Sequence, residues 1–310
     1  MIYTVTLNPA LDKTVEIQKF TIDSVNRITA MRTDPGGKGI NVSKVIRKLG
    51  RKSIATGILG GATGRTVQKA LEDLGVESAF RFVKGETRTN LKVVDPVCHT
   101  NTDLNEPGLT VSEEILQEVL QELTDRLTKE DLVVLSGSLP KGAPKDTYRT
   151  WVHACKKTGA KVFLDVDGAL LQAGIQASPY LIKPNHHELG ALLSRELKSP
   201  EEIAQAAREL MENYGIEKVV VSMGGDGALY VTGEETIRAE GLKVPVGSTV
   251  GAGDSVVAAL AAAEEAGMTL HETVRLSTAT GAANVMCSGT QAAEYETIEK
   301  LMPEVVFYRM

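Results

Sequence analysis

Short apolar segments rich in β-branched residues recur along this chain, and stretches with helical periodicity separate most of them. A chain that alternates strands with helices in this way folds back through crossover connections, which favour parallel strand pairing. The segments expected to form strands are Ile2–Leu7, Ile54–Leu59, Leu132–Leu135, Lys161–Val166, Tyr180–Ile182 and Lys218–Ser222. The alternation therefore predicts an α/β fold built on a mostly parallel sheet.

Two of the intervening stretches have clear helix boundaries. The stretch after Gly39 has apolar residues at helical spacing and stops at Gly50, a residue favoured just past a helix end. The stretch after Ser112 repeats this spacing, and its serine and two glutamates suit a helix N-terminus. The apolar positions are Val42, Val45, Ile46 and Leu49 in the first stretch and Leu116, Val119, Leu120, Leu123 and Leu127 in the second. We expect a helix in each.

Two segments, at about 13–33 and 80–104, break this alternation, because they contain short strand patterns and turns but no helix. We therefore expect them to form a small β lid on the main domain. The chain has no internal repeat, no low-complexity tract and no clear linker. Residues 1–310 are accordingly expected to form one domain, with the two lid segments inserted in it.

One strand of the expected lid separates polar from apolar side chains. Because side chains alternate between the two faces of a strand, Arg88, Asn90 and Lys92 share one face, and Leu91 and Val93 share the other. The polar face carries suitable groups to close over a phosphate. An ordinary edge strand with one solvated face fits the same pattern, so the alternation alone does not decide between the two.

The balance of charge excludes some partners. The chain has 34 Lys and Arg against 40 Asp and Glu, for a formal charge of -6, and its sequence pI is about 5.6. Neither a nucleic acid nor an anionic membrane surface is an expected partner of such a chain. An anionic substrate would need a locally basic pocket.

The cysteines and the apolar segments indicate a compartment. Cys98, Cys155 and Cys287 lie far apart without metal-binding spacing, and their odd number argues against a disulfide framework. The N-terminal residues have no secretory leader pattern. The longest alanine-rich run, Val256–Ala263, is much shorter than the ~20 apolar residues of a membrane span. We expect a soluble, cytoplasmic protein with reduced thiols.

The strongest functional signal is the segment Val250–Ser255, which reads VGAGDS and leads into a helical stretch. Its glycines allow backbone N–H groups to approach an anion, and a helix N-terminus adds a partial positive charge. Asp254 could accept the proton of a substrate hydroxyl as that hydroxyl attacks a phosphorus atom. The structural alternative is that Asp254 caps the helix in a Gly-rich turn.

A second glycine cluster, Pro35–Asn41, also precedes a helix. Its sequence PGGKGIN is not a Walker A loop, because Gly39 follows Lys38 where that motif needs Ser or Thr. The cluster suits backbone contacts to a sugar or phosphate, or a purely structural turn. Asp12 follows the first strand, where ligands bind in open α/β sheets, and could bond sugar hydroxyls or form a turn.

Two further polar clusters follow predicted strands. Asn185 and Glu188, just after Lys183, are three residues apart and could hold a hydrated Mg²⁺ on one helical face. The segment Ser222–Ala228 reads SMGGDGA and ends a strand in a glycine turn. That turn could border a nucleotide or form a hairpin.

The order of these clusters is more specific than any one of them. With an early GGKGIN and a late VGAGD, the chain resembles the ribokinase-like (PfkB) carbohydrate kinase family over about its full length. The branch of 1-phosphofructokinases and tagatose-6-phosphate kinases is the most similar, through LNPALD, GGKGINVS, TRTNLK, TDLNEPG, LSGSLP and KPNHHEL. Of these motifs, TRTNLK and TDLNEPG look more like 1-phosphofructokinase. The resemblance implies a three-layer α/β/α domain with a β-sheet lid, and ATP and Mg²⁺ as cofactors.

The resemblance also implies roles for individual residues. Asp254 would be the catalytic base, and the amides of Gly251, Ala252 and Gly253 would form an anion hole. The sugar would be held by Asp12, Gly37, Lys38 and Asn41, and its phosphate by Arg88 and Asn90, with Arg27, Lys38 and Ser138 as weaker candidates. The nucleotide would lie against Lys183, Asn185, Ser222, Gly224, Gly225, Asp226, Gly227 and Asn284, and Mg²⁺ against Asn185 and Glu188.

The implied reaction is ATP-dependent phosphorylation of fructose 1-phosphate at its C6 hydroxyl, giving fructose 1,6-bisphosphate and ADP. Tagatose 6-phosphate is the second acceptor to weigh and fructose 6-phosphate the third, because the local sequence does not orient the sugar. A sugar-phosphate sensor without turnover and a nucleoside kinase are alternatives from other classes. Asp254 with its glycines argues against the first, and Arg88 against the second. A homodimer through the lid is implied by resemblance alone.

Two departures from the family pattern affect the expected specificity for the sugar more than the expected phosphoryl transfer. Asp165–Gly168 reads DVDG where similar kinases often read DTSG, and Pro96–Asn101 exceeds the usual lid turn. Neither change affects Asp254 or the expected anion hole. They leave the fine specificity for the sugar open.

Overall fold

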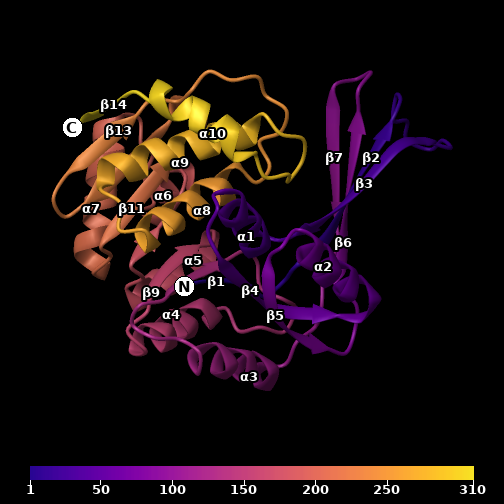
Figure 1. Ribbon diagram of the computed structural model, residues 1–310, viewed down its shortest axis with the longest axis horizontal. Coiled ribbons are helices and arrows are strands. Elements are labelled where there is room, and N and C mark those ends of the chain that lie inside the picture. The colour runs from indigo at the N-terminus through magenta and orange to yellow at the C-terminus, as the bar shows by residue number, and fades with distance from the viewer.

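The computed structural model describes residues 1–310 and contains two sheets. The larger sheet has ten strands in the order β14-β13-β12-β11-β10-β9-β8-β1-β4-β5, and the smaller has four in the order β3-β2-β6-β7. In Figure 1 helices surround the larger sheet, and the smaller sheet projects from this body. The expected α/β fold with a β lid is confirmed.

Seven neighbouring strands of the large sheet pair in parallel and three edge strands pair antiparallel. The parallel strands are β1 (Ile2–Thr6), β4 (Ser53–Gly60), β5 (Glu77–Val83), β8 (Leu132–Ser136), β9 (Lys161–Asp165), β10 (Leu181–Ile182) and β11 (Lys218–Ser222). The antiparallel edge is formed by β12 (Ala228–Thr232), β13 (Thr236–Ala239) and β14 (Phe307–Arg309). All six strands predicted from the sequence are present, whereas β5 and the antiparallel edge were not predicted.

Helices cover both faces of this sheet. One layer contains α1 (Lys38–Lys48), α2 (Gly61–Asp73), α8 (Ala252–Glu265), α9 (Leu270–Val285) and α10 (Tyr295–Leu301). The other contains α3 (Glu113–Thr124), α4 (Thr147–Lys157), α5 (Gly168–Gly174), α6 (His186–Leu192) and α7 (Pro200–Tyr214). The two helices predicted from apolar spacing correspond to α1 and α3. None of the helices has both the length and the apolar character needed to cross a membrane.

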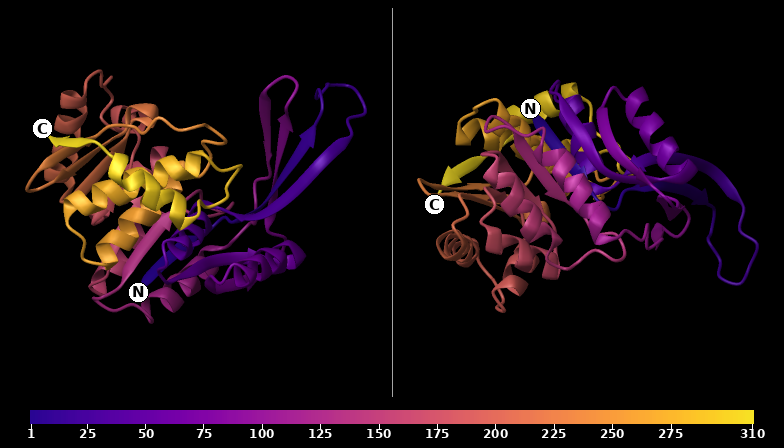
Figure 2. Two further views of the ribbon diagram at one scale, coloured as in Figure 1. Left: turned by 45° about the horizontal axis from the view of Figure 1, so that its top comes forward. Right: turned by 90° about the horizontal axis from the view of Figure 1, so that it is seen from below.

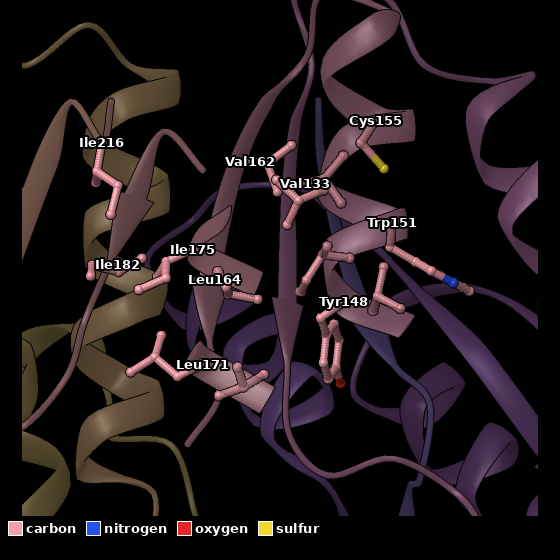
Figure 3. Packing of buried hydrophobic residues seen from close by; sticks show 14 of the residues in the cluster. Val133, Tyr148, Trp151, Cys155, Val162, Leu164, Leu171, Ile175, Ile182 and Ile216 are labelled. Atoms are coloured by element: carbon pink, nitrogen blue, oxygen red, sulfur yellow. The ribbon is translucent and has the colours of Figure 1, made fainter. Parts of the chain in front are cut away.

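Alternating side chains of the central strands supply a core to each helix layer. In β1, Tyr3 and Val5 join the core under α3, α4 and α7, whereas Ile2 joins the core under α1, α8 and α9. Figure 3 shows part of the first core, where Trp151 and Cys155 of α4 face the central strands. Burial of each large apolar side chain stabilises the fold by about 1.5–3 kcal/mol, so the two cores fix the helices on the sheet.

One core residue also fixes a loop near the open edge of the sheet. Tyr148 of α4 is fully buried, and its hydroxyl donates to the carbonyl of Gly137 over 2.9 Å. Gly137 directly follows β8. A buried phenol needs such a partner, so this hydrogen bond attaches the loop after β8 to the core of the domain.

The lid consists of β2 (Ala10–Ile17), β3 (Ile28–Gly36), β6 (Arg88–Asp95) and β7 (Thr100–Asn105), and it extends well beyond the body in the views of Figure 2. Val15, Ile17 and Val93 form a small apolar cluster on one face. The predicted lid boundaries need correction. The first segment extends beyond 13–33 at both ends, and residues 80–83 of the second belong to β5, which pairs with β4 in the large sheet.

Two neighbouring strands of the large sheet, β1 and β4, approach each other closely at Gly57. This residue has φ +137°, and a Cβ on it would lie 1.9 Å from the carbonyl oxygen of Thr6. Such an overlap can be relieved only by moving the β1 backbone, since the obstructing atom belongs to the main chain.

We therefore predict that Gly57→Ala lowers the free energy of unfolding by about 3 kcal/mol or more, through backbone strain and overlap. Gly50→Ala is the matched control, because Gly50 has φ +74° but a methyl group added there would meet no atom within 4 Å. It should cost roughly 1–2 kcal/mol. Urea unfolding followed by circular dichroism compares the two, and equal losses would contradict the role assigned to the contact.

Candidate active site

A polar cavity of about 420 Å³ lies where the carboxyl ends of the parallel strands meet the lid. Only one of its 21 lining residues is hydrophobic. Open α/β sheets bind ligands at this edge because the loops after the strands converge there. The residues expected from the sequence that line the cavity are Asp12, Gly37, Lys38, Asn41, Arg88, Asn90, Ser138, Gly251 and Asp254.

Asp254 lies in the first turn of α8, and its carboxylate is buried. Its Oδ2 accepts a hydrogen bond of 2.8 Å from Nδ2 of Asn41, on α1. The N-cap of α8 is Gly251, and no side chain caps this helix. The alternative in which Asp254 serves as a capping residue is therefore wrong. With no side-chain cap, amides of the first turn remain available to an anion.

The surroundings of Asp254 change its acidity. Burial raises its pKa to about 6, and the negative charge of Asp165 adds to the increase, while the hydrogen bond from Asn41 and the charges of Lys38 and Lys183 oppose it. A carboxyl with this pKa is mostly ionised at neutral pH and still binds a proton readily. Both properties are required of a general base.

Asp165, at the end of β9, is the centre of the charged cluster behind the cavity. Its carboxylate oxygens lie 3.4 Å from Nζ of Lys183 and 3.6 Å from Nζ of Lys38. Burial favours the protonated form of Asp165, but the two lysine charges outweigh it and hold its pKa below the usual value. The sequence placed Asp165 only in a departure from the family pattern. Its position at the end of a buried strand was the signal that could have identified it.

On the lid side, Asp12 and Asn90 form a pair across β2 and β6. Oδ1 of Asp12 accepts from Nδ2 of Asn90 over 3.0 Å, and the amide oxygen of Asn90 has no protein partner. Burial raises the pKa of Asp12, although the bond from Asn90 opposes the shift. A Cβ on Gly36 would lie 2.1 Å from Oδ2 of Asp12, so the glycine leaves space for this carboxylate.

Arg88 lies at the base of the lid. One terminal nitrogen donates to the carbonyl of Asn8 over 3.0 Å, the other to the carbonyl of Glu106 over 3.3 Å, and its buried Nε has no partner. The side chain of Asn8 donates in turn to Oγ of Ser138 over 3.2 Å. Asn8 thus links Arg88 and Ser138, two residues predicted to bind the sugar phosphate. Asn8 itself was not predicted as a site residue, although it belongs to the segment LNPALD.

The expectation of a basic pocket is only partly met. Four basic side chains line the cavity, but so do four acidic ones. The basic residues are Lys13, Lys38, Arg88 and Lys92, and the acidic residues are Asp12, Asp103, Asp167 and Asp254. Lys92, on the polar face predicted for β6, lies 3.7 Å from Asp103. Positive charge therefore occurs at specific positions, not as a uniform field.

The residues expected to bind the nucleotide do not line this cavity. Lys183 lies beside the start of α8, since its Nζ is 3.4 Å from the Cβ position of Gly253. Asn284 is buried on α9 near Gly251, and its amide oxygen has no protein partner. The amide of Ala252, expected in the anion hole, already donates to the carbonyl of Thr249 over 3.4 Å.

Asn185 and Glu188 form the capping box of α6. The amide of Glu188 donates to Oδ1 of Asn185, and the amide of Asn185 donates to Oε2 of Glu188, each over 2.8 Å. Oε1 of Glu188 takes no part in the box. No group of three or more His, Cys, Asp or Glu side chains is arranged to hold a metal ion.

Two expected features lie apart from the cavity. Gly224–Asp226 forms an exposed turn between β11 and the antiparallel β12, so the hairpin alternative describes its structure. Ser222, just before the turn, pairs with Asn185 through a β-bridge. Arg27 is exposed in the connection between β2 and β3 and does not line the cavity.

Several known proteins are similar to this chain over most or all of its length. Residues 5–298 match the sequence profile of the pfkB family of carbohydrate kinases. A 1-phosphofructokinase of Bacillus subtilis is 39% identical over 310 residues, which is 100% of both chains. A 1-phosphofructokinase of Rhodobacter capsulatus is 42% identical, over 90% of this chain and 88% of its own.

A solved structure extends the likeness to the fold. The crystal structure of phosphofructokinase-2 from Escherichia coli in complex with fructose-6-phosphate has a TM-score of 0.92 and 32% sequence identity. The alignment covers 98% of each chain. The profile match and the full-length identity are enough to assign the family. This chain belongs to the pfkB family of carbohydrate kinases.

Proposed function

We propose that the protein transfers the γ-phosphoryl group of ATP to the C6 hydroxyl of fructose 1-phosphate, giving fructose 1,6-bisphosphate and ADP. This proposal rests mainly on one observation. A single cavity is lined by the buried carboxylate of Asp254, at a helix start without a side-chain cap, and by the guanidinium of Arg88 on the lid. The full-length 1-phosphofructokinase relatives favour fructose 1-phosphate as the acceptor.

The sugar would lie between the lid and α8. The positively charged guanidinium of Arg88 lines this space and would bind the phosphate, and the carboxylate of Asp12 would accept hydrogen bonds from sugar hydroxyls. Asn90, Lys38, Gly37 and Ser138 complete the polar wall. With one phosphate held at the lid, the opposite end of the sugar points toward Asp254.

Asp254 then acts on the acceptor hydroxyl. Its Oδ2 is engaged by Asn41, so Oδ1 remains to accept the proton as the hydroxyl oxygen attacks the γ-phosphorus. Amides at the start of α8, together with Lys38 and Lys183, stabilise the negative charge of the transferring group. The base, the anion site and the lysines therefore converge on one point.

ATP would enter beside Lys183, over Asn185, Ser222 and the Gly224–Gly227 turn, with Asn284 behind the anion hole. Mg²⁺ neutralises charge on the ATP phosphates when bound. The free Oε1 of Glu188 suits that ion, because Mg²⁺ in kinases takes one or two carboxylates and fills its shell with phosphate and water. Asn185 contributes indirectly, since its side chain orients Glu188 through the capping box.

The acceptor is tested by steady-state kinetics with fructose 1-phosphate, tagatose 6-phosphate and fructose 6-phosphate. We expect the highest kcat/KM with fructose 1-phosphate. Arg88→Ala should raise KM for that sugar by ~10-fold or more, while KM for ATP stays within about twofold, since a charged hydrogen bond contributes about 1.5–3 kcal/mol.

Arg81→Ala is the matched control, because Arg81 lies on β5 and pairs with Glu118 and Glu122 outside the cavity. Its kinetic constants should equal those of the wild type. A preference for tagatose 6-phosphate or fructose 6-phosphate contradicts the proposed acceptor. Binding of sugar phosphates without any turnover would instead indicate a sensor.

The role of Asp254 is tested with Asp254→Asn, which keeps the shape and removes the base. We expect kcat to fall at least ~100-fold. In the wild type, kcat/KM should fall as pH drops below about 6, because a protonated carboxyl cannot accept the proton. An unchanged kcat in the variant, or a flat profile down to pH 5, contradicts the assignment.

The same variant should be more stable than the wild type at neutral pH. The folded pKa of Asp254 is raised above its ordinary value, so ionisation opposes folding as pH rises through about 6. The gain should be on the order of 2 kcal/mol at pH 7 and should disappear near pH 4. Thermal unfolding at both pH values measures it and separates loss of the base from damage to the fold.

We further propose that two copies of the chain associate through the lid. Exposed apolar side chains are concentrated there, and Ile22 and Val25 in the β2–β3 connection are more than four-fifths exposed. Ile28 and Met31 of β3 add to this surface. Exposed apolar side chains gathered on one projecting sheet favour association through it.

Sedimentation velocity should therefore give a dimer, and the double substitution Ile28→Asp with Met31→Asp should give a monomer, because two buried charges oppose the contact. Val246→Asp is the control, since Val246 is a similarly exposed apolar residue on the body. A monomeric wild type, or equal dissociation in the control, contradicts association through the lid.

A further inference from the structure

Lys44, in the middle of α1, is a buried lysine that has no role in the mechanism proposed above. Its side chain is only 7% exposed. Its ammonium donates to the carbonyl of Thr290 over 2.9 Å, to the carbonyl of Pro35 over 3.2 Å and to Oδ1 of Asn41 over 3.2 Å. A lysine has three N–H donors, so these three acceptors satisfy it completely.

The contact with Asn41 determines how that side chain is oriented. An ammonium can only donate, so it must face the amide oxygen of Asn41. The amide nitrogen then points the other way, where it donates to Oδ2 of Asp254 over 2.8 Å. A flipped amide would put N–H groups against the ammonium and an oxygen against a carboxylate. The chain Lys44–Asn41–Asp254 therefore has one favourable arrangement.

We propose that Lys44 is a positioning residue for Asp254, which it holds through Asn41 with Oδ2 engaged and Oδ1 directed to the acceptor hydroxyl. This inference rests on the proposed kinase function. Because Lys44 does not touch the substrate cavity, its loss should affect the chemical step more than sugar binding.

The other two contacts of Lys44 stabilise the walls around this arrangement. Pro35 lies near the end of the lid strand β3, and Thr290 follows α9 and lines the cavity. The Cα of Thr290 is 3.9 Å from the Cβ position of Gly251, the N-cap of α8. One ammonium thus connects the base of the lid, the start of the anion site and the partner of the base.

The charged groups around Asp254 and Lys44 determine the pKa values of both side chains. Asp254 is faced by Asp165 of β9, Lys38 of α1 and Lys183 after β10, in addition to Asn41. Lys44 is faced by three carboxylates and one guanidinium: Asp34 and Arg32 of β3, Asp12 of β2 and Asp254 of α8. Since the carboxylates outnumber the guanidinium, removing the Lys44 charge leaves these groups with excess negative charge and raises the pKa of Asp254.

The test compares Lys44→Met, Lys44→Arg and the control Lys48→Met, using the sugar phosphate that the wild type phosphorylates best. For Lys44→Met we expect kcat at pH 8 to fall ~10–100-fold and KM for the sugar to change less than threefold. We also expect the acidic limb of the pH profile, where kcat/KM falls at low pH, to move to a pH about one unit higher. Lys44→Arg keeps the charge and should leave the limb where it is in the wild type. Lys48→Met removes a half-exposed lysine one turn further along α1, which pairs with Glu294 away from the cavity, and should leave these kinetic constants unchanged.

A double-mutant cycle tests the route through Asn41. If Lys44 acts through Asn41, then Lys44→Met should reduce kcat less than twofold further in an Asn41→Ala background. Additive losses, or an acidic limb that stays in place in Lys44→Met, would overturn the proposal. If Lys44→Met does not fold, Lys44→Gln removes the charge while keeping two N–H donors, and the same shift is expected. A wild type without turnover would refute the proposed function instead, so the two failures are distinguishable.

Discussion

The site depends on the electrostatic balance among two buried carboxylates and the lysines beside them. Asp165 and Asp254 are both buried, so their carboxylates repel each other strongly, and ionising both is costly unless cations are close. Lys38 and Lys183, each within 3.6 Å of Asp165, provide those cations before any substrate arrives. The lysines are therefore already oriented when phosphate groups enter, and phosphate oxygens replace water that the lysines would otherwise bind.

The sheet makes this balance possible. Asp165 is the last residue of β9 and Lys183 follows the neighbouring strand β10, and parallel strands end on the same side of a sheet. Asp254 and Asn41 come from helices of one layer, α8 and α1, which contact each other. Backbone geometry, fixed by two apolar cores, thus brings together groups that are more than two hundred residues apart in sequence.

Much of this arrangement was predictable from local patterns. Strand spacing identified the parallel sheet, and glycine clusters at helix starts identified Gly37, Asn41 and Asp254. The antiparallel edge was missed because the turn after β11 fits a hairpin and a ligand loop equally well in sequence, and because β13 and β14 have only four and three residues. Lys44 and Asp165 were missed for another reason. The burial of Lys44 on its helix, and the two lysines that lie beside Asp165, depend on tertiary contacts that local sequence patterns do not contain. Arg27 illustrates the converse, since resemblance suggested a role in phosphate binding, but this side chain is exposed and does not line the cavity.

The lid has a mechanical consequence. Its strands leave the body near Ala10 and Gly36, and the polar groups that face the cavity, Asp12 and Asn90, lie close to those points. The lid is therefore a long lever that pivots close to the proposed sugar site. A small rotation at the base sweeps the distant tip through a wide arc but displaces Asp12 little. The entrance can thus widen for a doubly phosphorylated product to leave while Asp12 and Asn90, the residues proposed to contact the sugar, keep their geometry.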